Sequence, residues 1–136
     1  MLAFVKLTIF TVLALASGVV AQPPPCLRTY EVKAGDFCDK ISVEQGVSTY
    51  QLAAVNAGIV NALCTNLWVG QIICLAREGL DCSPVIKVVM LDTCESIATA
   101  AGITFERLLA NNPNLNADCS NLYPDEVLCV EPPVTS

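Results

Sequence analysis

The stretch Gly35-Asp36-Phe37-Cys38-Asp39-Lys40-Ile41 decides the fold of this chain, and it recurs as Leu91-Asp92-Thr93-Cys94-Glu95-Ser96-Ile97. Each copy predicts a tight turn, a short helix, and a cysteine in the first helical turn. Asp36 and Asp92 are expected to cap these helices, because a short carboxylate accepts hydrogen bonds from the first free amides of a helix. The residues around both copies recur as well, so the sequence predicts one small motif written twice.

The eight cysteines follow the same repetition. Their spacing is Cys26-x11-Cys38-x25-Cys64-x9-Cys74 in the first copy and Cys82-x11-Cys94-x24-Cys119-x9-Cys129 in the second. An even number of cysteines in small units predicts disulfides that pair inside each repeat, with three connectivities open in each set of four. A zinc site is disfavoured, since the chain has no histidine and no C-x-x-C pair.

The start of the chain predicts secretion. Residues 1–21 combine Lys6, an apolar run and the ending Val19-Val20-Ala21, which is typical of a signal peptide cut before Gln22; a membrane anchor is the alternative. Without Lys6 the mature chain keeps six basic and 13 acidic residues, a net charge of −7. An acidic protein without a basic stretch is a poor partner for nucleic acid or anionic membranes, so we expect a neutral or cationic ligand.

Each repeat predicts the order β-α-α-β, with antiparallel strands and both helices on one face of them, an α+β fold. Glycine is expected to end the first helix of each repeat, and Ser48 with Gln51, or Thr104, to cap the second. Asn56 and Asn112 are expected to end the second helices. The predicted strands are Tyr30–Val32, Gln71–Leu75 and Glu126–Val130, and the glycines are Gly46 and Gly102.

The chain divides at changes of composition. A proline-rich segment precedes the first repeat, a short linker that should keep the repeats close joins them, and an unstructured tail follows. The predicted segments are residues 1–21 for the signal peptide, 22–29 for the proline-rich segment, 30–75 for module 1, 76–85 for the linker, 86–130 for module 2 and 131–136 for the tail.

The pattern Tyr30-x-Val32-x-x-Gly35-Asp36-x-Cys38-x-x-Ile41, followed by Leu52-x-x-x-Asn56 and Asn66-Leu67-x-Val69-Gly70-Gln71-x-Ile73-Cys74, resembles a LysM module. The cysteines are similar to those of the secreted, disulfide-bearing fungal form. The second copy departs from the pattern, because Leu91 replaces the turn glycine, Asp125 replaces Gly70 and Glu126 replaces Gln71.

The resemblance implies a βααβ fold and a site for N-acetylglucosamine polymers, with chitin or chitin oligosaccharides as partners; peptidoglycan is the ligand of bacterial relatives. Family contacts lie in the loop after the first strand and in the loop after the second helix. Carried over, the ligand-binding residues are Ala34, Gly35, Asp36, Phe37, Asn56, Ala57, Gly58, Ile59 and Val60, and Met90, Leu91, Asp92, Thr93, Asn112, Pro113, Asn114, Leu115 and Asn116.

Several of these residues also have a structural reading. Asp36 and Asp92 are expected to cap helices rather than to act as catalytic acids, since a glycosidase needs two carboxylates across one bond. Asn56 and Asn112 are expected first to end helices. Trp68 and Tyr123, at matching positions, could stack on a sugar, but packing is favoured for both. Phe37 is the more plausible aromatic contact.

The sequence thus predicts a secreted, extracellular and non-catalytic chitin-binding protein, which can associate with the cell wall. The resemblance to the secreted fungal form implies that it would mask chitin from host receptors or shield it from chitinases, and we expect no metal or cofactor. We expect the first copy to bind better than the second, and the ligand can bring two molecules together. The alternative is a scaffold whose modules have lost sugar binding and bind a protein, because Leu91, Asp125 and Glu126 alter the expected sugar loop.

Overall fold

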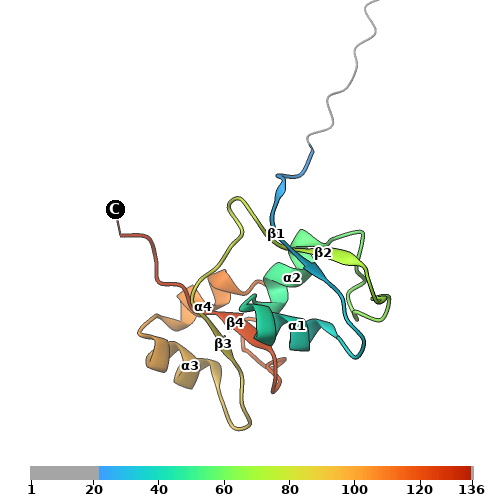
Figure 1. Ribbon diagram of the computed structural model, residues 1–136. Helices are drawn as coiled ribbons and strands as arrows, with labels where there is room; N and C mark the ends of the chain where they lie inside the picture. Colours follow the sequence, from blue (N-terminus) through green and yellow to red (C-terminus); the bar gives the residue numbers. More distant parts are fainter. Residues whose placement is uncertain (1–21, 136) are drawn as a thin grey trace, which may run out of the picture.

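The computed structural model describes residues 22–135, so the predicted signal peptide at residues 1–21 lies outside the described residues. Two β-α-α-β modules follow each other along the chain (Figure 1), and the predicted α+β class is confirmed. Among the described residues, no helix combines the length and hydropathy that crossing a membrane requires. The elements are β1 (Cys26–Glu31), α1 (Cys38–Gln45), α2 (Thr49–Val55) and β2 (Ile72–Arg77) in module 1, and β3 (Val85–Lys87), α3 (Cys94–Ala101), α4 (Phe105–Asn111) and β4 (Val127–Cys129) in module 2.

The strands at the two ends of each module form an antiparallel pair, as predicted. β1 pairs with β2 from Cys26 opposite Arg77 to Glu31 opposite Ile72. β1 begins earlier than the predicted start at Tyr30, because β2 continues to Arg77 and supplies partners for the additional residues. β3 and β4 form a shorter ladder of three pairs.

The predicted helix caps at Asp36 and Asp92 are wrong. The N-cap of α1 is Phe37, which makes no side-chain cap bond, and that of α3 is Thr93, which forms a capping box with Ser96. The two aspartates are not at the cap because each carboxylate turns back and accepts the amide proton of the residue three positions before it. Such local side-chain bonds compete with helix capping for the same carboxylate.

The other helix signals are confirmed. Gly46 and Gly102 follow α1 and α3 in the left-handed conformation, at φ 65° and 69°. Ser48 and Thr104 cap α2 and α4 through their hydroxyl oxygens. Gln51, however, does not complete a capping box, because its side chain is buried and is used elsewhere.

Each module encloses a small apolar core that disulfides brace. All eight cysteines form disulfides inside their own repeat, as predicted. In the chain-entropy model, closing loops of this length stabilises a fold by about 3–4 kcal/mol each. The pairs are Cys26–Cys74, Cys38–Cys64, Cys82–Cys129 and Cys94–Cys119, and the core residues include Val32, Ile41, Leu52 and Ile73 in module 1 and Val88, Ile97, Leu108 and Leu128 in module 2.

The two modules lie side by side, with α1 and α2 of module 1 against β4 of module 2 (Figure 1). The Tyr123 hydroxyl donates to Asp39 Oδ1 at 3.2 Å. The backbone amide of Val127 donates to Thr49 Oγ1 at 3.0 Å. These bonds join residues that are distant in sequence, and the prediction that the modules stay close is confirmed.

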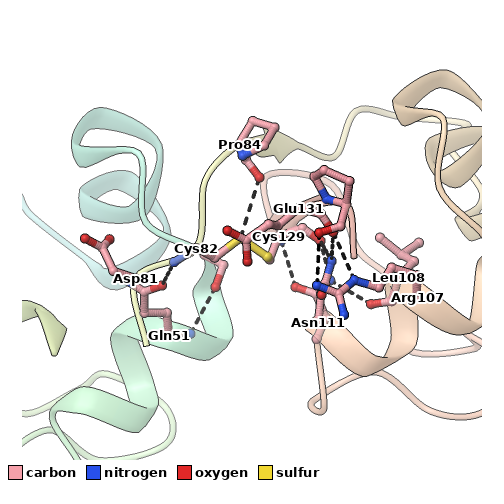
Figure 2. The surroundings of a disulfide bond; sticks show 12 residues. Gln51, Asp81, Cys82, Pro84, Arg107, Leu108, Asn111, Cys129 and Glu131 are labelled. Atoms are coloured by element: carbon pink, nitrogen blue, oxygen red, sulfur yellow. Dashed lines mark hydrogen bonds between the residues drawn. A yellow bond between two sulfur atoms is a disulfide. The ribbon is translucent and has the colours of Figure 1, made fainter. Parts of the chain in front are cut away.

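The linker is fastened to both modules at one place. Gln51 Nε2 donates to the Leu75 carbonyl at 2.8 Å, and Gln51 Oε1 accepts the Cys82 amide at 2.7 Å. Cys82 is in turn bonded to Cys129 of β4, so the disulfide lies between α2 and α4 (Figure 2). Gln51 therefore holds the chain where it leaves module 1.

Arg107, which matches Gln51 in the repeat, does the same for the chain leaving module 2. Its guanidinium donates to the Glu131 carbonyl at 3.1 Å and to the Pro132 carbonyl at 3.2 Å (Figure 2). The described part of the tail has no regular secondary structure, as predicted, but its first residues are anchored to α4.

Candidate sugar-binding turns

The first turn of module 1 is closed by the Asp36 carboxylate. Asp36 Oδ2 accepts the Lys33 amide at 2.8 Å and the Tyr30 hydroxyl at 2.7 Å, and Oδ1 accepts from Lys40 Nζ at 3.3 Å. The Asp36 side chain is only 2% exposed. The turn is therefore rigid, and Ala34, Gly35 and Phe37 around it remain exposed.

These hydrogen bonds stabilise the ionised form of the Asp36 carboxyl. The Lys33 amide, then the Tyr30 hydroxyl, lower the pKa of the Asp36 carboxyl below its ordinary value of 3.8. The same bond to the Asp36 carboxylate raises the pKa of Tyr30 to about 12. A carboxyl that stays ionised to low pH is unsuited to be a general acid, which needs a raised pKa.

The matching turn of module 2 keeps the backbone geometry with different side chains. Asp92 Oδ2 accepts the Val89 amide at 2.9 Å, and the Asp92 amide donates to the Val89 carbonyl at 3.1 Å. Leu91 has φ 74°, close to the 84° of Gly35, although a side chain there is strained. Val89, Met90 and Leu91 are 55%, 78% and 94% exposed, so this turn presents three large apolar side chains where module 1 has Lys33, Ala34 and Gly35.

The second loop of each module begins at a buried asparagine. Asn56 Nδ2 donates to the Leu52 and Cys74 carbonyls at 2.8 and 2.6 Å, and Asn56 Oδ1 accepts the Cys74 amide at 2.8 Å. Asn112 makes the same bonds to Leu108 and Cys129. Both asparagines end their helices as predicted, and their side chains point into the protein. Both residues are at most 1% exposed, and their backbone amides and carbonyls are also hydrogen-bonded within the protein, so neither presents a free group at the surface.

A second asparagine, for which the sequence predicted no role, holds the far end of this loop. Asn66 Nδ2 donates to the Ile59 carbonyl at 3.0 Å and Asn66 Oδ1 accepts the Asn61 amide at 2.9 Å. Asn121 does the same with Asn114 and Asn116, at 2.8 Å each. The recurrence of asparagine at this position was the available signal for this role.

A disulfide brings the two loops of each module to the same end. Cys38 follows the first turn directly and is bonded to Cys64, shortly after the second loop; Cys94 and Cys119 do the same in module 2. Leu115, a predicted contact, is instead part of the core of module 2. The predicted residues that are exposed are Ala34, Gly35, Phe37, Ala57, Gly58 and Ile59 in module 1, and Met90, Leu91, Thr93, Pro113, Asn114 and Asn116 in module 2, while Asp36, Val60 and Asp92 are half-buried.

The two matching aromatic residues do not share one environment. Trp68 is 62% exposed, so the favoured packing is wrong for it, because no other part of residues 22–135 covers this position. Tyr123 is 40% exposed and contacts module 1 through Asp39. Burial, then the Asp39 carboxylate, raise the pKa of Tyr123 to about 12. Phe37 is 55% exposed beside the first turn, as a contact residue would be.

Three hollows of the surface lie near the module junction. The largest, of about 490 Å³, is lined by Tyr50, Leu80, Asn111 and Glu131 and meets the predicted site only at Pro113. One of about 230 Å³ includes Phe37, and one of about 260 Å³ includes Val60 and Tyr123. Of the predicted contact residues, Phe37, Val60 and Pro113 line these three hollows.

The described residues bring together one group with the composition of a metal site, formed by Cys82, Cys129 and Glu131. Its two sulfur atoms are bonded to each other, so neither is a thiolate that could bind a cation. The chemistry that the turns offer is instead hydrogen bonding by backbone amides and carbonyls beside small apolar patches.

Comparisons with known proteins agree with the two-module fold described above. The family profile of the LysM domain matches residues 30–76 and 86–131. "Secreted LysM effector Blys8" of Beauveria bassiana (strain ARSEF 2860) is 31% identical over 137 aligned positions, which cover 77% of this chain and 34% of that protein. "Secreted LysM effector LysM1" of Trichophyton rubrum (strain ATCC MYA-4607 / CBS 118892) is 29% identical, with 77% and 50% covered.

A third relative, "Secreted LysM effector Vd5LysM" of Verticillium dahliae (strain VdLs.17 / ATCC MYA-4575 / FGSC 10137), is 36% identical, with 84% of this chain and 17% of that protein covered. The chain thus spans half or less of the length of these three relatives. Their names agree with the secreted localisation that the sequence predicts.

Proposed function

The chain belongs to the LysM domain family, and from this premise we propose that it is a secreted, non-catalytic protein that binds polymers of N-acetylglucosamine, with chitin as its ligand. The observation that carries the proposal is the pair of braced loops at one end of each module. Asp36, Asn56 and Asn66 fix their backbone from within, so that few groups have to be ordered when a ligand binds.

The chemistry of the turns suits this sugar. An N-acetyl sugar is neutral and offers an amide donor, a carbonyl acceptor and a methyl group. Exposed backbone groups around Gly35 and Gly58 can pair with the amide, and the exposed Phe37 and Ile59 side chains offer apolar contacts for the methyl group and the ring. The proposed contacts are the loop residues 34–37 and 56–60 in module 1, and 90–93 and 112–116 in module 2, the last through its exposed members.

We propose a non-catalytic function because the carboxylates at the turns stabilise the turns themselves. Asp36 and Asp92 close their turns, and the lowered pKa of Asp36 is the reverse of what the acid of a glycosidase requires. A protein that only binds chitin would act by occupying it. We propose that it masks chitin fragments from host receptors or covers wall chitin against chitinases.

Calorimetric titration with chitin oligomers, from dimer to hexamer, tests the function. We expect heat of binding and a rise in melting temperature that grow with oligomer length, and none with cellulose oligomers, which lack the acetamido group. If neither signal appears at about 1 mM hexamer, the free energy of binding is weaker than about 4 kcal/mol, and the proposal is wrong. Peptidoglycan fragments in the same titration separate the two possible polymers.

A second candidate function rests on the module 2 turn. Val89, Met90 and Leu91 expose three consecutive apolar side chains, and Leu91 does so in a left-handed conformation that glycine, as at Gly35, adopts without strain. Such a turn suits a protein partner. The two functions separate in one titration, since a scaffold without sugar binding gives no heat with chitin hexamer.

A further inference from the structure

The repeat makes it possible to compare one surface in two environments. In module 2 the residues Tyr123 and Val127 face α1 and α2 of module 1, and Val127 is only 1% exposed. The matching residues of module 1 are Trp68 and Ile72, and nothing in residues 22–135 covers them. They are 62% and 58% exposed, and Val69 between them is 65% exposed. We call Trp68, Val69 and Ile72 the strand surface of module 1.

An exposed group of large apolar side chains costs solubility and marks interaction sites in soluble proteins. Within this chain, the matching surface of module 2 already has an occupant, namely the helices of the preceding module. Module 1 has no preceding module among the described residues. The strand surface is therefore the same docking surface without its partner.

Within residues 22–135, no second module covers the corresponding helical surface of module 2. In module 1 the receiving residues are Asp39, Thr49 and Ala53, which lie around Tyr123. Their matches in module 2 are Glu95, Phe105 and Leu109, which we call the helix face; Glu95 is exposed, and the other two are half-buried because one side of each packs against the core of module 2. Within residues 22–135, each molecule thus has one unused surface of each kind.

We propose that the strand surface of one molecule docks on the helix face of a second copy, which gives head-to-tail association without any sugar. In this arrangement Trp68 Nε1–H donates to the Glu95 carboxylate, as the Tyr123 hydroxyl donates to Asp39. Phe105 stands where Thr49 is, so the hydrogen bond to the strand amide is replaced by an apolar contact with Ile72. The linker contact of Gln51 has no counterpart, because Arg107 binds the tail of its own chain.

The expected association is weak and open-ended. A small contact without a covalent linker belongs to the class of weak interfaces that bury less than about 1,200 Å². A contact between two different surfaces does not close on itself unless its rotation forms a ring, so further copies can add at either end.

Sedimentation of the secreted protein without sugar, from about 10 µM to about 1 mM, tests the proposal. We expect the average mass to rise with concentration beyond that of a dimer. Ile72→Asp disables the strand surface and Glu95→Arg the helix face, so each variant alone should remain monomeric. Mixed in equal amounts, the two variants should form a one-to-one complex and nothing larger.

Leu27→Asp is the matched control. Leu27 is 56% exposed, similar to Ile72, and lies on strand β1 outside both surfaces, so this variant should associate like the parent. The melting temperature of each variant shows that the fold is kept. A parent that stays monomeric at about 1 mM, a closed dimer as the largest species, or a mixture that does not associate would each overturn the proposal.

Discussion

At the scale of single residues, Asp36 shows how one carboxylate sets the shape of a binding turn. Its side chain, which is only 2% exposed, accepts hydrogen bonds from Lys33, Tyr30 and Lys40. The Asp92 side chain closes the matching turn with one hydrogen bond, from the Val89 amide. Ile86 and Ser96 stand where module 1 has the tyrosine and the lysine. The two aspartates are therefore a natural pair for comparison.

Asp36→Asn should destabilise the protein at pH 7 by about 1–3 kcal/mol, the usual worth of hydrogen bonds to a charged group. Because the folded pKa of Asp36 lies below its ordinary value, its contribution is present above pH 3.8 and is lost as the pH falls below it. Denaturant unfolding of parent and variant at pH 7 and pH 3 measures both effects. Asp92→Asn should lower the free energy of unfolding at pH 7 by less than Asp36→Asn does. An equal loss of stability would contradict the role given to Tyr30 and Lys40.

Gly35 allows a second test at this scale. A Cβ at Gly35 would meet no atom within 4 Å, so a substitution there acts through the backbone, which has φ 84°. Gly35→Val should weaken retention on chitin about tenfold, because a β-branched residue moves the turn out of its left-handed conformation. Leu91→Val should have a smaller effect, since module 1 is proposed to bind better. Equal effects in a chitin-retention titration would contradict that ranking.

At the scale of helices, strands and loops, much could be predicted because the signals are local. Gly46, Ser48 and Thr104 act at helix ends as their residue types predict, and the recurring cysteine spacing predicted pairing inside each repeat. The role of Asp36 could not be predicted, because a carboxylate before a helix can cap it or close the preceding turn with similar local bonds. The connectivity of the cysteines depends on which loops meet in space, which spacing does not determine.

The disulfide Cys38–Cys64 is predicted to serve binding as well as stability, since it joins the two loops of the proposed site. The double variant Cys38→Ala with Cys64→Ala should lose chitin retention strongly. The control is Cys26→Ala with Cys74→Ala, which opens a longer loop, of sequence separation 48 against 26, and should cost at least as much stability in the chain-entropy model. Melting temperatures and retention measured side by side separate the two effects. A control that loses as much retention would refute the local role.

At the scale of the whole molecule, the junction between the modules holds a buried carboxylate. Glu126 is 1% exposed; Asn114 and the Tyr123 amide donate to it, and Asp39 of module 1 lies nearby. No sequence signal pointed to this junction, because its contacts join positions such as Asp39 and Tyr123 across the two repeats. At the matching position, module 1 has the neutral Gln71.

The Glu126 junction predicts a pH dependence of stability. Burial raises the pKa of Glu126 above its ordinary value of 4.5. Ionisation of Glu126 therefore lowers the free energy of unfolding, and this stability is lost as the pH rises through the folded pKa. Glu126→Gln should therefore raise the melting temperature at pH 8 relative to the parent, and raise it less at pH 4. A variant that is less stable than the parent at pH 8 would contradict this assignment.

The central claim is that backbone groups of two braced turns hold an uncharged acetylated sugar. Amide resonances of ¹⁵N-labelled protein, followed during titration with chitin tetramer, test it most directly. The account predicts shifts at Gly35, Phe37, Ala57, Gly58 and Ile59, weaker shifts in the matching turns of module 2, and none at the outward face of the α3 helix. An unchanged spectrum, or shifts confined to residues away from these turns, would contradict it.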